Sequence, residues 1–290
     1  MIIVRIWEGL GNQLFQYAYA KALALRTGQQ VALDIRETGA VHNDGNRQKR
    51  SCGLQHFRVT LPICRDAKQG DYFLNWNENI KNVLVHLSMK NVLPFKFFEE
   101  DVPDFKEQLM GIKGNWYLQG FFQNVKYFQE FENEIRQDLL PKKRIAIPNE
   151  LREILKSKAT VSVHIRRGDY CKIGNCLPKI YYENAVTYVK GHIENPFWIV
   201  FSDDICWTKN NMDFGNNCYY MTRELGFQDF EELLIMSKCK NHIISNSTFS
   251  WWGAWLDKCD AKLVVGPKWW FSGSGKYRGI NIMPDEWIRI

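Results

Sequence analysis

The sequence predicts an α/β fold with two domains, each built on a parallel sheet. Two observations predict it: residues 2–35 contain a strand, a glycine loop, a helix and a second strand, and strands alternate with helices between residues 160 and 265. This alternation is typical of parallel sheets that helices cover on both faces. A chain of 290 residues suits two domains or one large one. Two prolines and a basic cluster mark residues 141–148 as a linker, so we expect domains at 1–145 and 146–290.

The first domain is predicted from its opening strand–helix–strand unit. Residues 2–6 are mostly apolar and predict a short buried strand. Apolar residues at helical spacing follow as far as Gly28, and residues 30–35 predict the second strand. Residues 36–75 are polar and predict a long loop, and loops of that length are often functional. Residues 125–139 predict a further helix.

The second domain is predicted from a clearer alternation of apolar runs and helical patterns. Turn residues separate these segments, and no internal repeat is present. The predicted strands are residues 160–165, 197–201, 242–245 and 262–265, and the predicted helices are residues 181–192, 227–239 and 248–256. Two such domains in tandem suggest a cleft between them.

The composition argues against several classes of protein. Hydrophobic residues make up 45% and charged residues 24%, which is ordinary globular usage. The net charge of +6 is modest and the basic runs are short, which disfavours a nucleic-acid partner and suits an anionic small substrate such as a nucleotide. No apolar run approaches the roughly 20 residues of a membrane span, and no export signal opens the chain. A cytoplasmic location is therefore expected.

Neither the cysteines nor the histidines predict a metal site. The eight cysteines stand at irregular spacings, and the closest two are Cys171 and Cys176. Such spacings resemble neither a zinc site nor a disulfide framework, so reduced thiols are expected. The six histidines show no HxxxH or HExxH spacing. We therefore expect no metal and no cofactor.

Two arginines stand at the carboxyl end of the predicted strand 160–165. Alternation along the strand puts His164 and Arg166 on one side, and a glycine after Arg167 permits a tight turn. In open α/β sheets, ligands bind beyond the carboxyl ends of the strands. The arginines are suited to gripping a phosphate, and Asp169 to orienting an arginine or acting as a base. The alternative is a surface Arg–Asp salt bridge beside a buried histidine.

Polar residues also follow two other predicted strands. Residues 245–248 precede a helix whose N-terminal amides would bind an anion; the alternative is simply a well-capped helix. Residues 202–204 (SDD) are suited to Mg²⁺, to a ribose hydroxyl or purine edge, or to capping the helix that follows. Nucleoside contact is favoured over metal because the arginines and the helix terminus already balance phosphate charge.

The first strand ends in a loop with two glycines, residues 8–13. These glycines form neither a GxGxxG fingerprint nor a P-loop. The loop places Asn12 and Gln13 at a strand end, facing the expected cleft.

Taken in order, these segments resemble the bacterial α-1,2-fucosyltransferase family. The resemblance spans nearly the whole chain, and its arginine and Ser-Thr-Phe-Ser-Trp-Trp motifs are specific together. Residues 118–128 also resemble a family segment that usually has Tyr-Trp where this chain has Phe121-Phe122. The four main segments are residues 9–18 (GLGNQLFQYA), 164–170 (HIRRGDY), 202–204 (SDD) and 247–256 (STFSWWGAWL).

The resemblance implies a GT-B architecture, with two Rossmann-like domains facing across a cleft. Its carboxy-terminal half would bind GDP-fucose, and its amino-terminal half would hold the acceptor. The implied reaction transfers L-fucose to the 2-hydroxyl of a terminal galactose with inversion and without a required metal. A peripheral membrane contact through a lipid-linked acceptor is compatible with it.

The resemblance and the residue chemistry together assign roles. Arg166 and the amides of residues 247–249 would stabilise the charge that develops on the leaving diphosphate. The candidates for the base that deprotonates the acceptor are Asp169 and Glu8, although a loose, oxocarbenium-like transition state would need only a weak base. Glu8 departs from the family, which usually has glycine there, and its alternatives are an acceptor contact or an incidental loop carboxylate. The expected donor contacts are Gly11, Asn12, Gln13, His164, Arg166, Ser202, Asp203, Asn246, Ser247, Thr248 and Phe249.

A peripheral membrane-interaction protein, with residues 268–271 (KWWF) and 276–278 (KYR) as interfacial anchors, is one further hypothesis, although such residues more often simply pack. Two other functions fit parts of the sequence. One is a related transferase with another linkage or another nucleotide sugar. The other is a carbohydrate-binding protein without catalysis, which the 11 Trp and 12 Tyr suggest. A lectin needs neither the arginine loop nor the helix terminus, which favours the enzyme.

Overall fold

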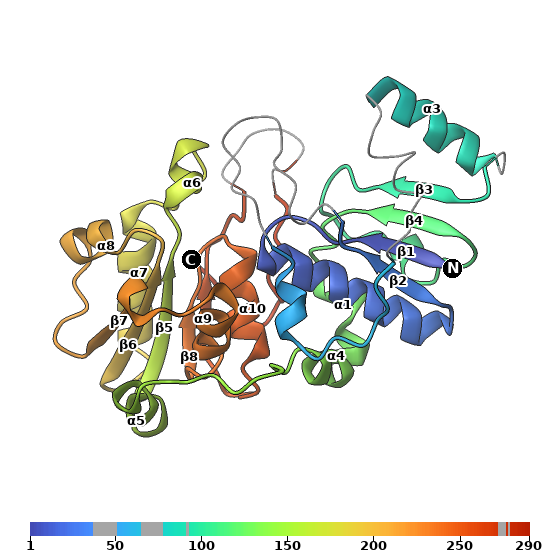
Figure 1. Cartoon of the computed structure of the whole chain (residues 1–290). Helices are drawn as coiled ribbons and strands as arrows, with labels where there is room; N and C mark the ends of the chain where they lie inside the picture. The colour runs from blue at the N-terminus through green and yellow to red at the C-terminus, as the bar shows by residue number, and fades with distance from the viewer. Residues whose placement is uncertain (37–50, 65–77, 91–92, 272–276, 278) are drawn as a thin grey trace. The chain divides into compact units, whose positions relative to one another are not determined.

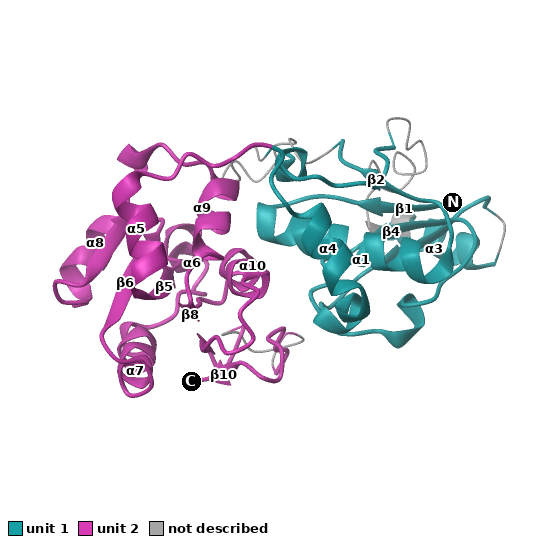
Figure 2. Cartoon of the chain, turned by 90° about the horizontal axis from the view of Figure 1, so that it is seen from below, with its two compact units in different colours: residues 1–142 teal, residues 143–290 magenta. Residues whose placement is uncertain are grey.

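The chain folds into two compact units, residues Met1–Lys142 and Lys143–Ile290 (Figure 2). The computed structural model describes residues 1–36, 51–64, 78–90, 93–271, 277 and 279–290. The division between the units falls inside the predicted linker, residues 141–148.

Unit 1 contains a four-stranded parallel sheet in the order β2-β1-β4-β3. The strands are β1 (Ile2–Arg5), β2 (Val31–Asp34), β3 (Lys96–Glu99) and β4 (Trp116–Gln119), and the helices are α1 (Leu10–Thr27), α3 (Glu78–Met89) and α4 (Glu132–Asp138). Short 3₁₀ turns occupy Gly53–His56, Glu107–Leu109, Val125–Tyr127 and Gln129–Phe131. Helix α1 packs on β1 and β2 (Figure 1).

The opening of unit 1 follows its sequence pattern closely. All four residues of β1 are buried, as expected of a central parallel strand. Helix α1 ends at Thr27 because Gly28 adopts a left-handed conformation with φ 66°, and its N–H donates to the Ala24 carbonyl at 3.0 Å. The predicted strand–helix–strand unit is therefore confirmed.

Unit 2 contains a six-stranded parallel sheet in the order β10-β9-β8-β5-β6-β7. Figure 1 shows β5, β6 and β7 side by side. The strands are β5 (Ala159–Ile165), β6 (Pro196–Ser202), β7 (Cys218–Met221), β8 (Asn241–Ile243), β9 (Val264–Gly266) and β10 (Ile288–Arg289). The helices are α5 (Asn149–Ser157), α6 (Gly168–Lys172), α7 (Lys179–Lys190), α8 (Ile205–Asn211), α9 (Asp229–Met236) and α10 (Thr248–Leu256).

The strand order of unit 2 reverses direction between β5 and β8. The chain runs outward from β5 through β6 to β7, and then returns to place β8 on the other side of β5. Ligands of open parallel sheets bind at such a switch point, beyond the carboxyl ends of the two strands. In this unit those ends are residues 166–169 and 244–248.

Helix α10 is held in place by close packing. Its side chains from Ser250 to Trp255 are all buried. A Cβ on Gly253 would lie 2.3 Å from the Met236 sulfur, so only glycine lets α10 approach α9 this closely. Trp251 donates its indole N–H to the Ile282 carbonyl at 3.0 Å. This packing fixes the position of the first turn of α10.

The predicted elements of unit 2 are all present, although others were not anticipated. The predicted strand 262–265 begins two residues later, at Val264. Strands β3, β4, β7 and β10 and helices α3, α5 and α6 had no clear sequence signal, and α8 was anticipated only as the helix that residues 202–204 would cap. The prediction of one helix over residues 125–139 is wrong, because Phe128 leaves helical geometry with φ −142° and only residues 132–138 form an α-helix. Much of the predicted loop 36–75 lies outside the described residues.

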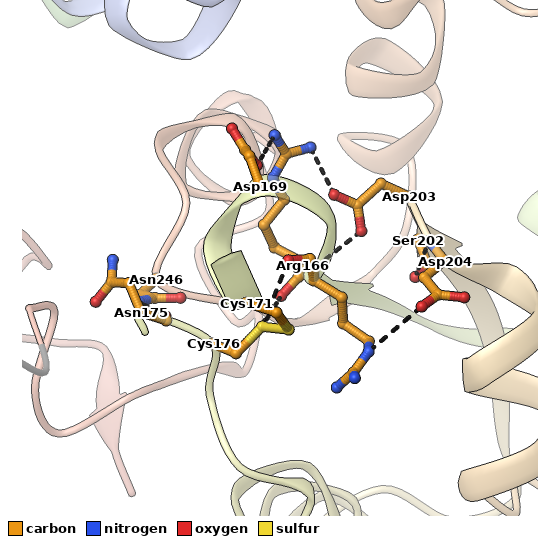
Figure 3. Close-up of a disulfide and its surroundings, with 10 residues drawn as sticks. Arg166, Asp169, Cys171, Asn175, Cys176, Ser202, Asp203, Asp204 and Asn246 are labelled. Atoms are coloured by element: carbon orange, nitrogen blue, oxygen red, sulfur yellow. Dashed lines mark hydrogen bonds and ion pairs between the residues drawn. A yellow bond between two sulfur atoms is a disulfide. The ribbon is translucent and has the colours of Figure 1, made fainter. Parts of the chain in front are cut away.

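The expectation of reduced thiols is also wrong for one pair. A disulfide joins Cys171 to Cys176, because the chain turns back after α6 and brings their Cα atoms to 4.8 Å (Figure 3). Cys52, Cys64, Cys206, Cys218, Cys239 and Cys259 are free. Among the helices that the structure describes, none has the length and apolar character needed to cross a membrane.

Candidate functional site

The switch point of unit 2 gathers five charged side chains. We call Arg166, Arg167, Asp169, Asp203 and Asp204 the switch-point cluster. Arg166 lies between two carboxylates: its Nη2 is 2.7 Å from Asp169 Oδ1, and its Nη1 is 2.9 Å from Asp203 Oδ2 (Figure 3). These bonds use two of the five guanidinium N–H donors and fix the orientation of the planar group.

The position of Asp203 depends on a glycine. Its Oδ1 accepts the Arg167 N–H at 2.8 Å, and a Cβ on Gly168 would lie 2.7 Å from its Oδ2. The residue after Arg167 must therefore lack a side chain for the carboxylate to reach Arg166. The glycine predicted to permit a tight turn also permits this approach.

Arg167 and the residues around Asp204 form the outer part of the cluster. The Arg167 guanidinium lies 3.6 Å from the centre of the Trp207 ring, which is the geometry of a cation–π contact. Asp204 accepts the Trp207 N–H at 3.0 Å and caps α8. The Ser202 hydroxyl accepts the Asp204 N–H at 3.0 Å. Capping, one of the alternatives predicted for residues 202–204, is therefore present.

His164 connects the two strand ends of the switch point. It is buried, its Nδ1 lies 2.9 Å from the Ser245 hydroxyl, and its ring contacts Phe249 with centroids 5.6 Å apart. Burial, together with the charge of Arg166, lowers the pKa of His164 to about 3. The imidazole is therefore neutral, and it contributes hydrogen bonds without charge.

The segment before α10 is pinned by Asn246. Its Nδ2 donates to the Asn175 carbonyl at 3.0 Å and to the Trp270 carbonyl at 3.3 Å, while its buried Oδ1 has no partner among the described residues. Ser247 is the N-cap residue of α10, and its side chain makes no capping bond. Thr248 and Phe249 form the first turn, where backbone N–H groups attract anions.

Unit 1 has a corresponding switch point between β1 and β4. The side chain of Gln13 is buried, and its amide bonds to the Glu8 carbonyl (2.7 Å), the Ser51 carbonyl (3.2 Å) and the Gly53 N–H (2.8 Å). Both polar atoms of the Gln13 side chain thus make hydrogen bonds inside unit 1, and its expected contact with a donor stays a prediction. Asn12 accepts a bond from the Gln123 side chain at 2.9 Å, and Gly11 is buried inside α1.

Glu8 has a strained backbone at this second switch point. Its φ of 67° lies in the left-handed region that glycine adopts readily and that other residues rarely occupy. It stands between β1 and α1, and its carbonyl accepts the bond from Gln13. Strained residues cluster at functional sites, which keeps Glu8 among the candidates.

A second strained residue of unit 1 is held by a buried carboxylate. Phe122 has φ 51°, and Glu100 Oε2 accepts the N–H groups of Phe121 (2.6 Å) and Phe122 (3.1 Å). Burial raises the pKa of Glu100 to about 7, although these two bonds act in the opposite direction.

This raised pKa predicts a pH-dependent stability. The folded protein binds the Glu100 proton more tightly than the unfolded chain does, so the contribution is complete below the ordinary pKa of 4.5 and is lost as the pH rises to about 7. Glu100→Gln removes this dependence. We expect the urea midpoint of the variant to fall less than that of the parent between about pH 5 and about pH 8. Glu134→Gln, an exposed change on α4, is the control, and an equal fall in all three proteins contradicts the assignment.

The two switch points differ in what they offer a ligand. The switch-point cluster of unit 2 presents two guanidinium groups beside the first turn of α10, which suits an anion with several oxygens. The edge of unit 1 presents Glu8, Asn12 and Gln123. Its arginines at the strand ends are bonded within the unit, Arg5 to Gln119 and Arg36 to Asp34. Within the described ranges, no group of three or more His, Cys, Asp or Glu side chains could hold a metal ion.

Several residues of the site carried no sequence signal. The stacking of Arg167 on Trp207 and the bonds of Asn246 to Asn175 and Trp270 join segments far apart in the chain. The spacing of Cys171 and Cys176 was noted but did not indicate a bond. Their proximity follows from the turn after α6, which only the folded chain shows.

Comparison with known proteins gives a consistent result. The family described as Glycosyl transferase family 11 matches residues 1–290. The chain is 30% identical to the Escherichia coli "Alpha-1,2-colitosyltransferase" (100% of this chain, 99% of the relative) and 32% identical to the Escherichia coli "O-antigen biosynthesis glycosyltransferase WbnK" (97% and 98%). It is 23% identical to the human "Galactoside alpha-(1,2)-fucosyltransferase 1", with 85% of this chain and 62% of the relative covered.

A solved structure supports the fold. A mutant of Arabidopsis thaliana FUT1, solved in complex with GDP, matches with a TM-score of 0.53 at 11% identity, covering 91% of this chain and 69% of that one. The predicted α/β fold of the GT-B class, with two Rossmann-like units, is confirmed.

Proposed function

The chain belongs to glycosyl transferase family 11, and on that basis we propose that it transfers L-fucose from GDP-β-L-fucose to the 2-hydroxyl of a terminal β-galactoside with inversion. The observation that carries the proposal is the switch-point cluster beside the first turn of α10. The relative named as an α-(1,2)-fucosyltransferase supports the linkage. The relative named for O-antigen biosynthesis supports a surface polysaccharide as the product.

The chemistry assigns Arg166 to the leaving group. The acceptor 2-oxygen bonds to the anomeric carbon as the bond from that carbon to the β-phosphate oxygen breaks, and GDP leaves with the electron pair. Arg166 and the N–H groups of the α10 first turn stabilise the charge that develops on the diphosphate. His164, being neutral, donates or accepts a hydrogen bond at the same strand end. Asp203 and Ser202, at the end of the neighbouring strand β6, are assigned to contacts with the nucleoside.

The acceptor proton goes to a carboxylate. Asp169 is half exposed and already bonded to Arg166, so it both orients the guanidinium and lies close to the diphosphate. Glu8 stands at the switch point of unit 1. Each is proposed as the base, and Asp169→Asn and Glu8→Gln distinguish them through the loss of kcat.

Donor binding tests the proposal before any acceptor is known. We expect calorimetry to show that GDP and GDP-fucose bind, that UDP does not, and that adding Mg²⁺ or EDTA leaves the affinity unchanged, because the proposed anion site uses arginines and amides. GDP-mannose reports how far the fucose itself is read. A protein that binds no guanosine nucleotide is not the proposed transferase.

A second candidate is colitosyl transfer with the same linkage. It is favoured by the 30% identity to the Escherichia coli protein named for that activity. Incubation with each nucleotide sugar and a β-galactoside, followed by analysis of the product, separates the two. A fucosylated product linked at the 2-position supports the first candidate, and transfer only from the colitosyl donor supports the second.

A further inference from the structure

Four large hydrophobic side chains are exposed in the described part of unit 2, and Trp269 among them lines a pocket. They are Ile173, Ile180, Trp269 and Tyr277, which are 72%, 57%, 57% and 38% exposed. The pocket has a volume of about 480 Å³, and its apolar lining includes Leu177, Pro178, Tyr181, Pro267, Trp269 and Phe271.

The segments that carry these residues are joined, although they come from distant parts of the chain. Asn246 donates to the Asn175 carbonyl and to the Trp270 carbonyl, which joins the segment after α6 to the segment after β9. Figure 3 shows Asn246 beside Asn175, close to the disulfide. The Tyr277 ring contacts Phe271 with centroids 5.4 Å apart. The surface therefore does not depend on a single side chain.

A lysine directly precedes each of these hydrophobic residues. The pairs are Lys172-Ile173, Lys179-Ile180 and Lys268-Trp269, and the three lysines are exposed. The sequence repeats the pattern at Lys276-Tyr277, although Lys276 lies outside the described residues. We call the three described pairs and Tyr277 the lysine–apolar face.

The nearby acidic side chains are already paired. Glu183 lies 3.1 Å from the Lys179 Nζ, and Asp169 is bonded to Arg166. Lys268 extends over the Trp269 ring, with its Nζ 5.6 Å from the ring centre. The face thus combines apolar side chains with the cationic Lys172 and Lys268, while the charge of Lys179 is offset by Glu183.

We propose that the lysine–apolar face binds the surface of an anionic lipid bilayer. Apolar and aromatic side chains of this kind enter the boundary between headgroups and acyl chains, and lysines beside them meet anionic headgroups. A second copy of the chain is a less suitable occupant, because two such faces would bring like charges together. The face lies at the carboxyl edge of the sheet, as does the switch-point cluster.

The proposal bears on the substrate in one respect. Helix α6 supplies both Asp169 and Lys172, and Ile173 is its C-cap residue, so the face and the cluster adjoin in sequence and in the fold. A glycan on a lipid carrier would reach the cluster from the membrane surface. Only this consequence rests on the proposed function.

Vesicle binding tests the proposal with the full chain. Flotation would be compared on phosphatidylcholine vesicles with and without phosphatidylglycerol. We expect binding to the anionic vesicles, weaker binding at higher salt, and a roughly five-fold loss of partitioning for each lysine removed. The test variants are Trp269→Ala and the triple change Lys172→Gln, Lys179→Gln and Lys268→Gln.

A second triple variant controls for net charge. Lys156→Gln, Lys190→Gln and Lys238→Gln remove the same charge from exposed positions outside the face. An unchanged control triple beside a weakened test triple supports the proposal. An equal loss in both triples, or no binding to anionic vesicles, overturns it.

Two further measurements test for a second copy on the face and for the folding of the variants. Light scattering reports whether the parent is a dimer that Trp269→Ala dissociates; such a result would assign the face to a second copy and overturn the proposal. Thermal unfolding confirms that the variants fold. Because the vesicle assay contains neither sugar donor nor acceptor, its failure leaves the transferase proposal untouched, and failure of donor binding leaves the vesicle result untouched.

Discussion

Replacing Arg166 by alanine is expected to leave a folded protein whose transferase activity is about 100- to 1000-fold lower. Losses of this size follow when one donor that stabilises developing charge is removed. Arg166 is fixed by Asp169 and Asp203, so its remaining N–H groups are oriented before the substrate arrives. The measurement is kcat/KM with GDP-fucose and a β-galactoside, together with the affinity for GDP.

Two control variants sharpen this test. Arg166→Lys keeps the charge and loses the planar fork, so it should recover only part of the activity. Arg152→Ala removes an arginine of α5 that bonds Asn149 and the Ile147 carbonyl, and it should leave kcat/KM unchanged. Substantial activity in Arg166→Ala would remove the residue from the proposed mechanism.

Replacing Trp251 by alanine is expected to lower the free energy of unfolding by about 3–5 kcal/mol. Trp251 is fully buried, and its ring contacts those of Trp252, Trp255 and Trp287, with centroids 5.1, 6.1 and 5.4 Å away. Removing it leaves a cavity beside α10 and takes away the N–H that bonds the Ile282 carbonyl. Urea unfolding measures the change.

The matched control is a tryptophan on the surface. Trp269→Ala removes the same side chain from an exposed position, so its free energy of unfolding should stay within about 0.5 kcal/mol of the parent. Similar losses in the two variants would mean that burial of Trp251 does not account for its effect.

The alternating part of the fold could be predicted because each segment carries its own periodic signal. The unit β1–α1–β2 and the elements β5, α7, β6, α9, β8, α10 and β9 have apolar runs bounded by turn residues. Strand β4 was missed for the opposite reason. Trp116–Gln119 lies among aromatic residues without a clear period, and it becomes a strand by pairing with β1 and β3. Tertiary hydrogen bonds of this kind leave no local trace.

The residues of the candidate site likewise divide into those with a local sequence signal and those without one. The arginines and the start of α10 were predicted because they directly follow apolar strands. Residues that directly follow a parallel strand lie at the carboxyl edge of the sheet. The hydrogen bonds that Gln13 makes inside unit 1 were not predicted, because its partners Ser51 and Gly53 are distant in sequence. The Cys171–Cys176 disulfide was missed because spacing alone does not show how a turn directs its side chains.

The strained backbone of Glu8 implies that thermostability and catalytic turnover favour different residues at this position. Glycine holds a φ of 67° without strain, whereas an L side chain there costs about 1 kcal/mol. Selection for thermostability alone would therefore drive position 8 toward glycine, and selection for turnover would keep the carboxylate only if the reaction uses it. Two libraries of variants, one selected for thermostability and one for turnover, would show by the residue that each retains at position 8 whether this carboxylate acts in the reaction.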